Sequence, residues 1–283
     1  MKVIFLFVDG VGIRPPAADN PVNPEVCPTF CRLIARHSVP IDACLGVDGP
    51  PQSATGQSTM FTGVNTPRAM GRHCEGFPGP SLRQLIERDN LFLQLRRRHL
   101  RFRFADAYLV DTPDELAARR FKSVTTVMAL TTPEAISTAA DLADDNAVMQ
   151  DLTRETVQDR RPDIPTITPR EAAEHLFAIA RANDFTLFEY FQTDVAGHSM
   201  DYDRACAVLR SYDLFLSTLT RLTEAAGITL MMTADHGNIE AMDERGHTKN
   251  PVPFVVFGPR EREIRAPVKS LEDVTPTILR IWD

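Results

Sequence analysis

Three short apolar runs that each end on an aspartate constrain the fold of this chain more than any other feature. They occur in the stretches "VIFLFVDG", "LFEYFQTDVAGH" and "LMMTADHGN", and their closing aspartates are Asp9, Asp194 and Asp235. Uninterrupted apolar runs of this length are typical of strands buried on both faces, as in parallel sheets. Because loops at the carboxyl ends of parallel strands converge on one crevice, we expect the three aspartates to lie close together.

Helical patterns separate these runs along the chain. We expect strands at 3–8, 39–47, 186–192, 228–233 and 254–257, and helices at 28–37, after Thr168, before Gly227 and near the end of the chain. Thr168 followed three residues later by Glu171 is a helix-start signature, and Gly227 is a helix-end signature. The sequence therefore predicts an α/β fold in which a mostly parallel sheet is sandwiched by helices.

Residues 67–158 do not follow this alternation. They contain the helical stretch "PSLRQLIERDNLFLQL", an arginine cluster and short extended pieces such as "RFRFADAYL". We interpret them as a small inserted cap lobe, with residues 1–66 and 159–283 forming a metal-binding catalytic core. The alternative is that this segment simply continues the sheet.

Composition limits the classes of function. The 283 residues can bury a sizeable core, and a net charge of −7 does not indicate a nucleic-acid-binding protein. No apolar run is long enough to span a bilayer, and the N-terminal run is too short for a signal peptide. The five cysteines form no CxxC pair, so we expect free thiols and a reducing, cytoplasmic location.

Histidines accompany the strand-end aspartates. His198 follows Asp194, His236 follows Asp235, and His247 lies in "GHTKNPVPF". Each residue alone could be a turn former, a helix cap or an exposed loop residue. Together, carboxylates and neutral imidazoles at this density suit Zn or Mn. Six such residues are too many for one ion, and two adjacent divalent ions are the arrangement used for in-line displacement at phosphorus.

A candidate nucleophile is found in the stretch "PPQSATGQSTMFTG", which we expect to form a loop. It offers the hydroxyls of Ser53, Thr55, Ser58, Thr59 and Thr62. A serine hydroxyl is a weak nucleophile that becomes reactive when a divalent cation stabilises its alkoxide. Taken alone, a loop rich in Ser and Thr is more often a solvated turn.

The motifs "VDGVG", "TDVAGH", "TADHGN" and "GHTKNPVPF" resemble, in order and wording, the metal-site motifs of the alkaline phosphatase superfamily. The resemblance is nearest to the branch of cofactor-independent phosphoglycerate mutase and phosphopentomutase, and it covers about 1–65 and 165–283. It implies two divalent metal ions, Mn or Zn. One would be held by Asp9, Ser53, Asp235 and His236, and the other by Asp194, His198 and His247.

The same resemblance implies that Ser53 is the nucleophile, with Thr55 as the second candidate. Gln57 departs from the pattern, because the mutases have a histidine there, and this puts the transfer of their substrate contacts in doubt. Sulfatases of the superfamily have a proline and an arginine shortly after their nucleophile. Both are absent after Ser53, which argues against a sulfatase.

From these features we expect a two-metal phosphoryl-transfer enzyme that acts on a small phosphate ester through a phosphoserine, with a phosphomonoesterase favoured. The alternatives are a phosphomutase and a non-catalytic, metal-stabilised domain that binds a phosphorylated ligand. Arg72, His73 and Lys249 are candidate substrate contacts, although each could equally face solvent. We expect a small phosphorylated partner and neither nucleic acid nor membrane.

Overall fold

The computed structural model describes residues 1–283 and contains one six-stranded sheet. Its strand order is β2-β6-β5-β1-β4-β3. The strands are β1 (Val3–Val8), β2 (Ser38–Ile41), β3 (Phe102–Phe104), β4 (Phe185–Tyr190), β5 (Thr229–Thr233) and β6 (Val252–Phe257). The four neighbours β3, β4, β1 and β5 are parallel, whereas β6 is antiparallel to both β5 and β2. The predicted mostly parallel sheet is confirmed.

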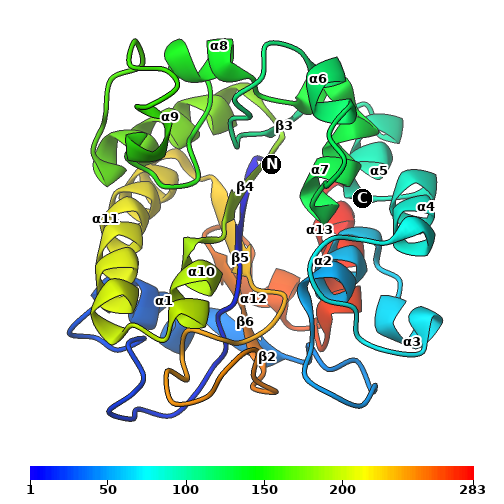
Figure 1. Cartoon of the computed structure of the whole chain (residues 1–283), viewed down its shortest axis with the longest axis vertical. Helices are drawn as coiled ribbons and strands as arrows, with labels where there is room; N and C mark the ends of the chain where they lie inside the picture. The colour runs from blue at the N-terminus through cyan, green and yellow to red at the C-terminus, as the bar shows by residue number, and fades with distance from the viewer.

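Helices cover both faces of this sheet (Figure 1). On one side lie α1 (Pro28–His37), α9 (Pro169–Ala182), α10 (Gln192–Ser199) and α11 (Tyr202–Ala226). On the other lie α2 (Ser53–Thr62), α4 (Pro80–Arg88), α5 (Leu91–Arg97), α7 (Val124–Leu130) and α13 (Val274–Leu279). The shorter helices are α3 (Thr66–Met70), α6 (Pro113–Ala117), α8 (Ala139–Ala143) and α12 (Glu261–Arg265), with 3-10 turns η1 (Pro133–Ala135), η2 (Glu155–Val157), η3 (Leu271–Asp273) and η4 (Arg280–Trp282). The predicted sandwich is therefore present.

The sheet is held by the apolar runs that predicted it. All six residues of β1 and of β4 are buried, and β1 pairs with β4 on one side and β5 on the other. Burial on both faces explains why these strands read as continuous apolar runs rather than alternating ones. Asp9 thus follows the central strand of the parallel part, directly between the strands that precede Asp194 and Asp235.

Local signals fix several boundaries. The Thr168 hydroxyl accepts a hydrogen bond from the Glu171 amide, and the Glu171 carboxylate accepts one in return from the Thr168 amide, so the predicted capping box starts α9. Helix α11 ends at Gly227, whose φ of 64° is left-handed. Residues 3–8 and 28–37 form a strand and a helix with the predicted ends. The strand predicted at 39–47 is shorter, because the chain leaves the sheet after Ile41.

The secondary structure predicted for residues 53–62 is wrong. Residues 53–62 were expected to form a loop, but they form helix α2, and nine of its ten residues are buried. It packs against α3, α4, α7 and α13. Serine, threonine and glycine have low intrinsic helix propensity, so tertiary packing determines the conformation here.

The segment 67–158 is joined to the rest of the fold by β3, which pairs with β4 in the same sheet. Residues such as Ile86, Phe92 and Phe104 belong to the main hydrophobic core. A separate small core of Leu142, Ala147, Val157 and Ile164 lies partly in this segment and partly beyond it. The division into a core and an inserted lobe remains a prediction, and the boundary at 158 crosses that small core.

All five cysteines are free thiols, as predicted. None of the helices is both long and apolar enough to cross a bilayer.

Candidate metal centre and active site

The carboxyl ends of three adjacent parallel strands bring the predicted site residues together. Asp9 follows β1, Asp194 lies in the first turn of α10 just after β4, and Asp235 follows β5. Gly10 lets the first and second of these loops touch: its φ is 70°, and a Cβ there would lie 2.6 Å from Asp194 Oδ1. Only glycine fits this close approach without displacing the aspartate.

One cluster of ligand atoms surrounds Asp194. His198 lies one turn further along α10, and its Nε2 is 3.3 Å from Asp194 Oδ2. His247 arrives from the loop before β6, with Nε2 3.7 Å from Asp194 Oδ1 and 3.1 Å from His198 Nε2. The Pro51 carbonyl lies 3.0 Å from His247 Nδ1 and orients that ring. The predicted helical turn thus places Asp194 and His198, the first and last residues of "DVAGH", on one face of the helix.

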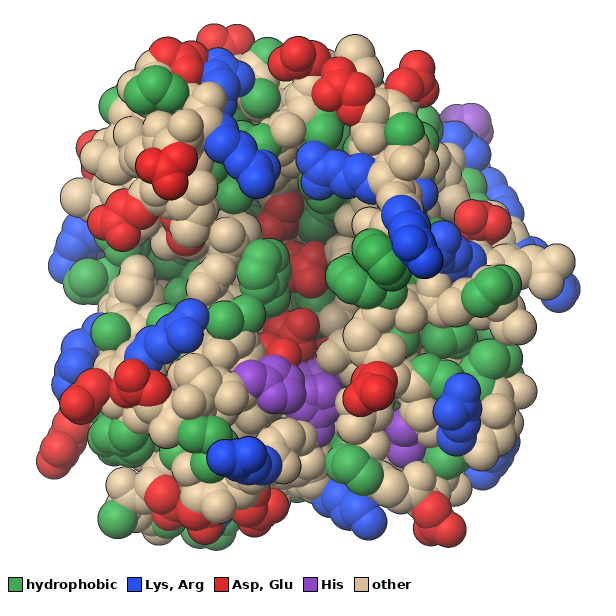
Figure 2. All heavy atoms as spheres, in the orientation of Figure 1, with side chains coloured by type: hydrophobic (Ala, Val, Ile, Leu, Met, Phe, Trp, Pro, Cys, Tyr) green, Lys and Arg blue, Asp and Glu red, His purple; other side chains and the backbone are tan.

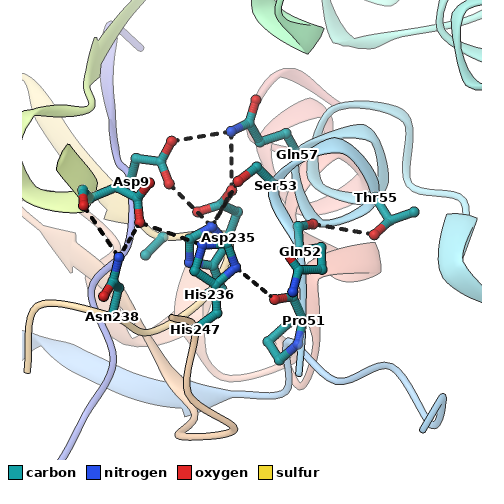
Figure 3. A network of polar contacts seen from close by, with 12 residues as sticks. Asp9, Pro51, Gln52, Ser53, Thr55, Gln57, Asp235, His236, Asn238 and His247 are labelled. Atoms are coloured by element: carbon teal, nitrogen blue, oxygen red, sulfur yellow. Dashed lines mark hydrogen bonds and ion pairs between the residues drawn. The ribbon is translucent and has the colours of Figure 1, made fainter. Parts of the chain in front are cut away.

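A second cluster surrounds His236 (Figure 3). Its Nε2 lies 3.4 Å from Asp9 Oδ1, 3.4 Å from Asp235 Oδ2 and 3.0 Å from Ser53 Oγ. Asp235 and His236 can converge because β5 has already ended at Thr233. The His236 and His247 rings stack with centroids 3.5 Å apart, so the two clusters are contiguous.

Burial and neighbouring charges shift the pKa values of the second cluster. Burial raises the pKa of Asp9 well above its usual range, and the neighbouring Asp235 and Asp194 carboxylates raise it further. Burial also raises the pKa of Asp235. Burial, followed by the nearby His247, lowers the pKa of His236 to about 3, so its imidazole is neutral and its lone pair is free to bind a cation.

These features fit divalent cations. The buried oxygens Asp9 Oδ1 and Asp235 Oδ1 have no hydrogen-bond partner, although buried carboxylate oxygens normally have one. Ligand atoms of Asp194, His198 and His247 lie within 4.8 Å of one another, and so do those of Asp9, Asp194 and His236. Asp194 belongs to both groups, whereas the resemblance implied a strict division between two ions. A carboxylate shared by two neighbouring ions is consistent with this geometry.

Ser53 is the first residue of α2, and it faces the cavity that contains Asp9 and Asp194. The amide groups and dipole at a helix N-terminus favour negative charge, which suits an alkoxide or a phosphate at this position. Thr55 is fully buried and points elsewhere: its hydroxyl donates to the Gln52 carbonyl at 3.2 Å and accepts from the Cys74 amide at 3.1 Å. Figure 3 shows Ser53 next to His236, with Thr55 on the far side of the helix.

Three residues in contact with the site were not among the predicted ones. Gln57 Nε2 donates to Asp9 Oδ2 at 3.3 Å and to Asp235 Oδ2 at 3.1 Å. Asn238 Nδ2 donates to Asp194 Oδ1 at 2.6 Å. Glu240 is fully buried and joins the motif loops. The only sequence signal for the last two is their position shortly after "DHG": Asn238 follows it directly and Glu240 two residues later.

Glu240 connects three of the four motifs through one carboxylate. Its Oε2 accepts from the backbone amides of Gly12 and Asn238, both at 2.8 Å. Its Oε1 accepts from the Thr248 hydroxyl at 2.6 Å and the Asn250 amide group at 3.0 Å. A single side chain therefore fixes the loops that carry Asp9, His236 and His247 relative to one another.

The predicted substrate contacts lie outside the cavity that contains Ser53. Arg72 and His73 line a neighbouring cavity of about 520 Å³, together with Gln52 and Phe77. Lys249 is exposed and lines neither cavity. A substrate contact by any of the three stays a prediction.

Known proteins resemble this chain over different extents. The protein-family model described as "Metalloenzyme superfamily" matches residues 1–282. The 2,3-bisphosphoglycerate-independent phosphoglycerate mutase of Dinoroseobacter shibae is 35% identical over 147 residues, which is 46% of this chain and 29% of that protein. The mutase of the same name from Gloeobacter violaceus is 33% identical over 134 residues, or 41% of this chain and 25% of that protein. The matched part thus spans less than a third of these relatives.

Solved structures resemble the whole chain. The cold-active alkaline phosphatase of a psychrophilic Shewanella covers 100% of both chains with a TM-score of 0.57 and 12% identity. The alkaline phosphatase of the Antarctic bacterium TAB5 covers 100% of this chain and 98% of its own, with a TM-score of 0.56 and 12% identity. At this identity the likeness concerns the fold. The chain therefore belongs to the metalloenzyme superfamily, and it has the fold of the alkaline phosphatases.

Proposed function

We propose that this protein is a metal-dependent phosphomonoesterase in which Ser53 is transiently phosphorylated. The observation that carries the proposal is the position of Ser53 Oγ, 3.0 Å from His236 Nε2 and beside the Asp9 and Asp235 carboxylates at a helix N-terminus. No other hydroxyl of α2 lines the cavity that contains Asp9 and Asp194. This matches the geometric roles required of a nucleophile next to a metal centre.

Two divalent ions, Mn or Zn, fit the ligand sets. Asp9, Ser53, Asp235 and His236 would hold one, and Asp194, His198 and His247 the other, with Asp194 able to reach both. When bound, such ions lower the pKa of a serine hydroxyl and neutralise charge on phosphoryl oxygens.

The chain's residues then divide the reaction between them. Ser53 Oγ loses its proton and forms a bond to phosphorus in line with the ester oxygen, the bond from phosphorus to that oxygen breaks, and the leaving alcohol takes up a proton, so that no proton is gained or lost overall. Water attacks the phosphoserine in the second half, which releases inorganic phosphate and restores the Ser53 hydroxyl. Because Ser53 is the first residue of α2, the positive end of the helix dipole would lie next to the phosphoryl group and favour its negative charge.

A phosphomutase is the second candidate, because the relatives that are 33% and 35% identical are named phosphoglycerate mutases. A mutase must keep its dephosphorylated intermediate away from water. Here Phe77 and Val195, which line the cavity, are 55% and 39% exposed, so water has access to it. Gln57 also occupies the position where the mutases have a histidine. Both features favour hydrolysis.

The test uses p-nitrophenyl phosphate with added Mn or Zn. We expect Ser53→Ala to lower kcat by about a thousandfold or more, whereas Thr55→Val, which removes the other candidate hydroxyl, retains most of the activity. Equal product release by wild type and Ser53→Ala would exclude Ser53 as the nucleophile. Binding of phosphate without turnover of any ester would favour the non-catalytic domain instead.

Phosphorus NMR separates hydrolysis from transfer. With phosphoglycerates and phosphopentoses as substrates, a phosphatase releases free phosphate. Interconversion of isomers without free phosphate would show that the enzyme is a mutase.

A further inference from the structure

The cavity in front of Ser53 is large for a substrate that is little more than a phosphate. Its volume is about 610 Å³, within the range of about 300–1,000 Å³ that binds drug-sized ligands. One end is formed by Asp9, Ser53, Gln57 and Asp194, and the cavity then extends along residues contributed mainly by the segment 67–158. A phosphoryl group bound at Ser53 needs only the first end, which leaves the rest of the cavity for the alcohol part of an ester.

This cavity is also lined by apolar and aromatic side chains. They include Phe77, Phe104, Tyr108, Met149, Phe191 and Val195. Phe77 is 55% exposed, and its ring lies 5.5 Å from that of Phe121, which is 60% exposed. Large apolar side chains exposed at a cavity mark a surface that is covered when a ligand binds. Figure 2 shows hydrophobic side chains on both flanks of a hollow that rises from the histidines.

Two arginines line the same cavity without partners of their own. Arg119 follows α6 and Arg160 follows η2, and neither guanidinium forms an ion pair or a hydrogen bond. Their sequence neighbours are engaged elsewhere: Arg161 pairs with Asp163 at 2.6 Å, and Arg120 lies 5.1 Å from the Phe121 ring. Helix α6 lies far above α2 and α10 in Figure 1, and Lys and Arg side chains surround the upper end of the hollow in Figure 2.

Two buried acids also line the cavity, and the chain itself engages both. Asp106 Oδ2 accepts from the Glu189 amide at 2.8 Å, and Glu189 Oε2 accepts from the Thr125 hydroxyl at 2.6 Å. Burial raises the pKa of Asp106 well above its usual range and that of Glu189 to about 7. Both carboxyls therefore carry less negative charge than exposed ones, and they oppose an anionic ligand correspondingly less.

We propose that the substrates are phosphate monoesters of an alcohol with a ring-sized apolar body and a second anionic group at its far end. The ester phosphate lies at Ser53, the apolar body lies along Phe77 and Tyr108, and Arg119 and Arg160 bind the distal anion. This inference rests on the proposed function and specifies its substrate class. It accounts at once for the length of the cavity, its apolar walls and its two unpaired guanidinium groups.

The experiment compares three esters of primary alcohols, so that the leaving groups have similar reactivity. They are ethyl phosphate, 2-phenylethyl phosphate and 2-phenylethyl phosphate with a carboxylate at the para position of the ring. We expect kcat/KM to rise roughly tenfold or more from the first to the second, because a phenyl ring is buried. A further rise of roughly tenfold is expected from the second to the third, because the carboxylate pairs with arginine.

Two sets of variants assign these gains to their side chains. Phe77→Ala removes most of the preference for phenylethyl over ethyl phosphate. The double variant Arg119→Ala/Arg160→Ala removes the gain from the carboxylate. The matched control Arg120→Ala/Arg161→Ala removes the same amount of charge at the two neighbouring positions in the sequence. It keeps the gain, since neither of its arginines lines the cavity. Circular dichroism confirms the fold of each variant.

The outcomes separate this inference from the function on which it rests. Equal kcat/KM for ethyl and phenylethyl phosphate, or an unchanged carboxylate gain in Arg119→Ala/Arg160→Ala, would overturn the substrate class. If Ser53→Ala still abolished ethyl phosphate turnover, the phosphomonoesterase would stand. Absence of turnover of all three esters by the metal-loaded wild type would overturn both.

Discussion

The two ends of the cavity are built in different ways. At the metal end, the side chains come from short motifs at strand ends, at helix starts and in the loop before β6, and Glu240, Asn238 and Gln57 hold these motifs in register. At the other end, the walls are single residues scattered from Phe77 to Arg160, with no shared motif. In the proposed function the first end carries the chemistry, so we expect it to tolerate little change. The second end would surround the variable part of the substrate, where we expect that a side chain can change without disturbing the proposed ligands.

The largest effect that this contrast predicts is loss of metal. Asp235→Asn and His247→Ala each remove a proposed ligand, and we expect metal affinity to fall by more than the roughly 10–100-fold typical of changes outside the ligand set. Plasma emission measures the bound metal, and circular dichroism checks the fold. Asp184→Asn is the matched control, because Asp184 precedes β4 at the opposite end of the strand from Asp194. Full occupancy in both ligand variants would remove these residues from the site.

The same contrast explains what could be read from the sequence. Asp9, Asp194 and Asp235 were predicted to meet because parallel strands converge at their carboxyl ends, a rule that needs only the strand pattern. The Asp194 and His198 pair needed only helical spacing. The structure brings these residues together as expected, although their roles as ligands await the metal measurements.

What could not be read depends on contacts between distant parts of the chain. Residues 53–62 have the composition of a loop, and only burial under neighbouring helices makes them helix α2. Gln57 is 48 and 178 residues away from the two carboxylates to which it donates. The aromatic wall formed by Phe77, Tyr108 and Phe191 has no local pattern, because its members come from different segments.

The next effect concerns the side chain that fixes the metal end. Glu240→Ala leaves four donors without their acceptor in a buried site, and we expect the free energy of unfolding to fall by about 3 kcal/mol. Urea unfolding of the chelator-treated protein measures it. Glu134→Ala is the control at an exposed glutamate outside the cavity: its pair with Arg96 at 3.7 Å contributes at most about 1 kcal/mol. Similar losses in the two variants would contradict the proposed role of Glu240 in holding the loops together.

A smaller effect concerns Glu189, a buried residue that lines the cavity, and the pH dependence of stability that it causes. Burial raises the pKa of Glu189 to about 7 from its usual value of about 4.5. Between these two pH values the folded protein keeps a proton that the unfolded chain has lost, so stability from this group is present at low pH and declines as the pH rises towards 7. The slope is at most about 1.4 kcal/mol per pH unit.

Glu189→Gln isolates this contribution, because an amide oxygen still accepts from Thr125 but does not titrate. As the pH rises from 4.5 to 7, the unfolding free energy of the wild type should fall by about 2 kcal/mol relative to that of the variant. Chelator-treated protein is used throughout, so that metal binding does not contribute. A difference that is constant with pH would show that Glu189 titrates normally.

The smallest effect concerns Gln57, which lies where the metal end meets the rest of the cavity. Its amide group donates to Asp9 and Asp235, whose carboxylates repel each other when no cation lies between them. Gln57→Ala should therefore destabilise the metal-free protein by about 1 kcal/mol and the metal-loaded protein by less. By linkage, a change that weakens the free state more than the bound state raises metal affinity, here by up to roughly fivefold. Metal titration measures this change, with Gln52→Ala as the control at a residue that donates to neither carboxylate. If affinity fell instead, Gln57 would be orienting the two carboxylates for the ion rather than substituting for its charge, and the metal end would extend one residue further into the cavity.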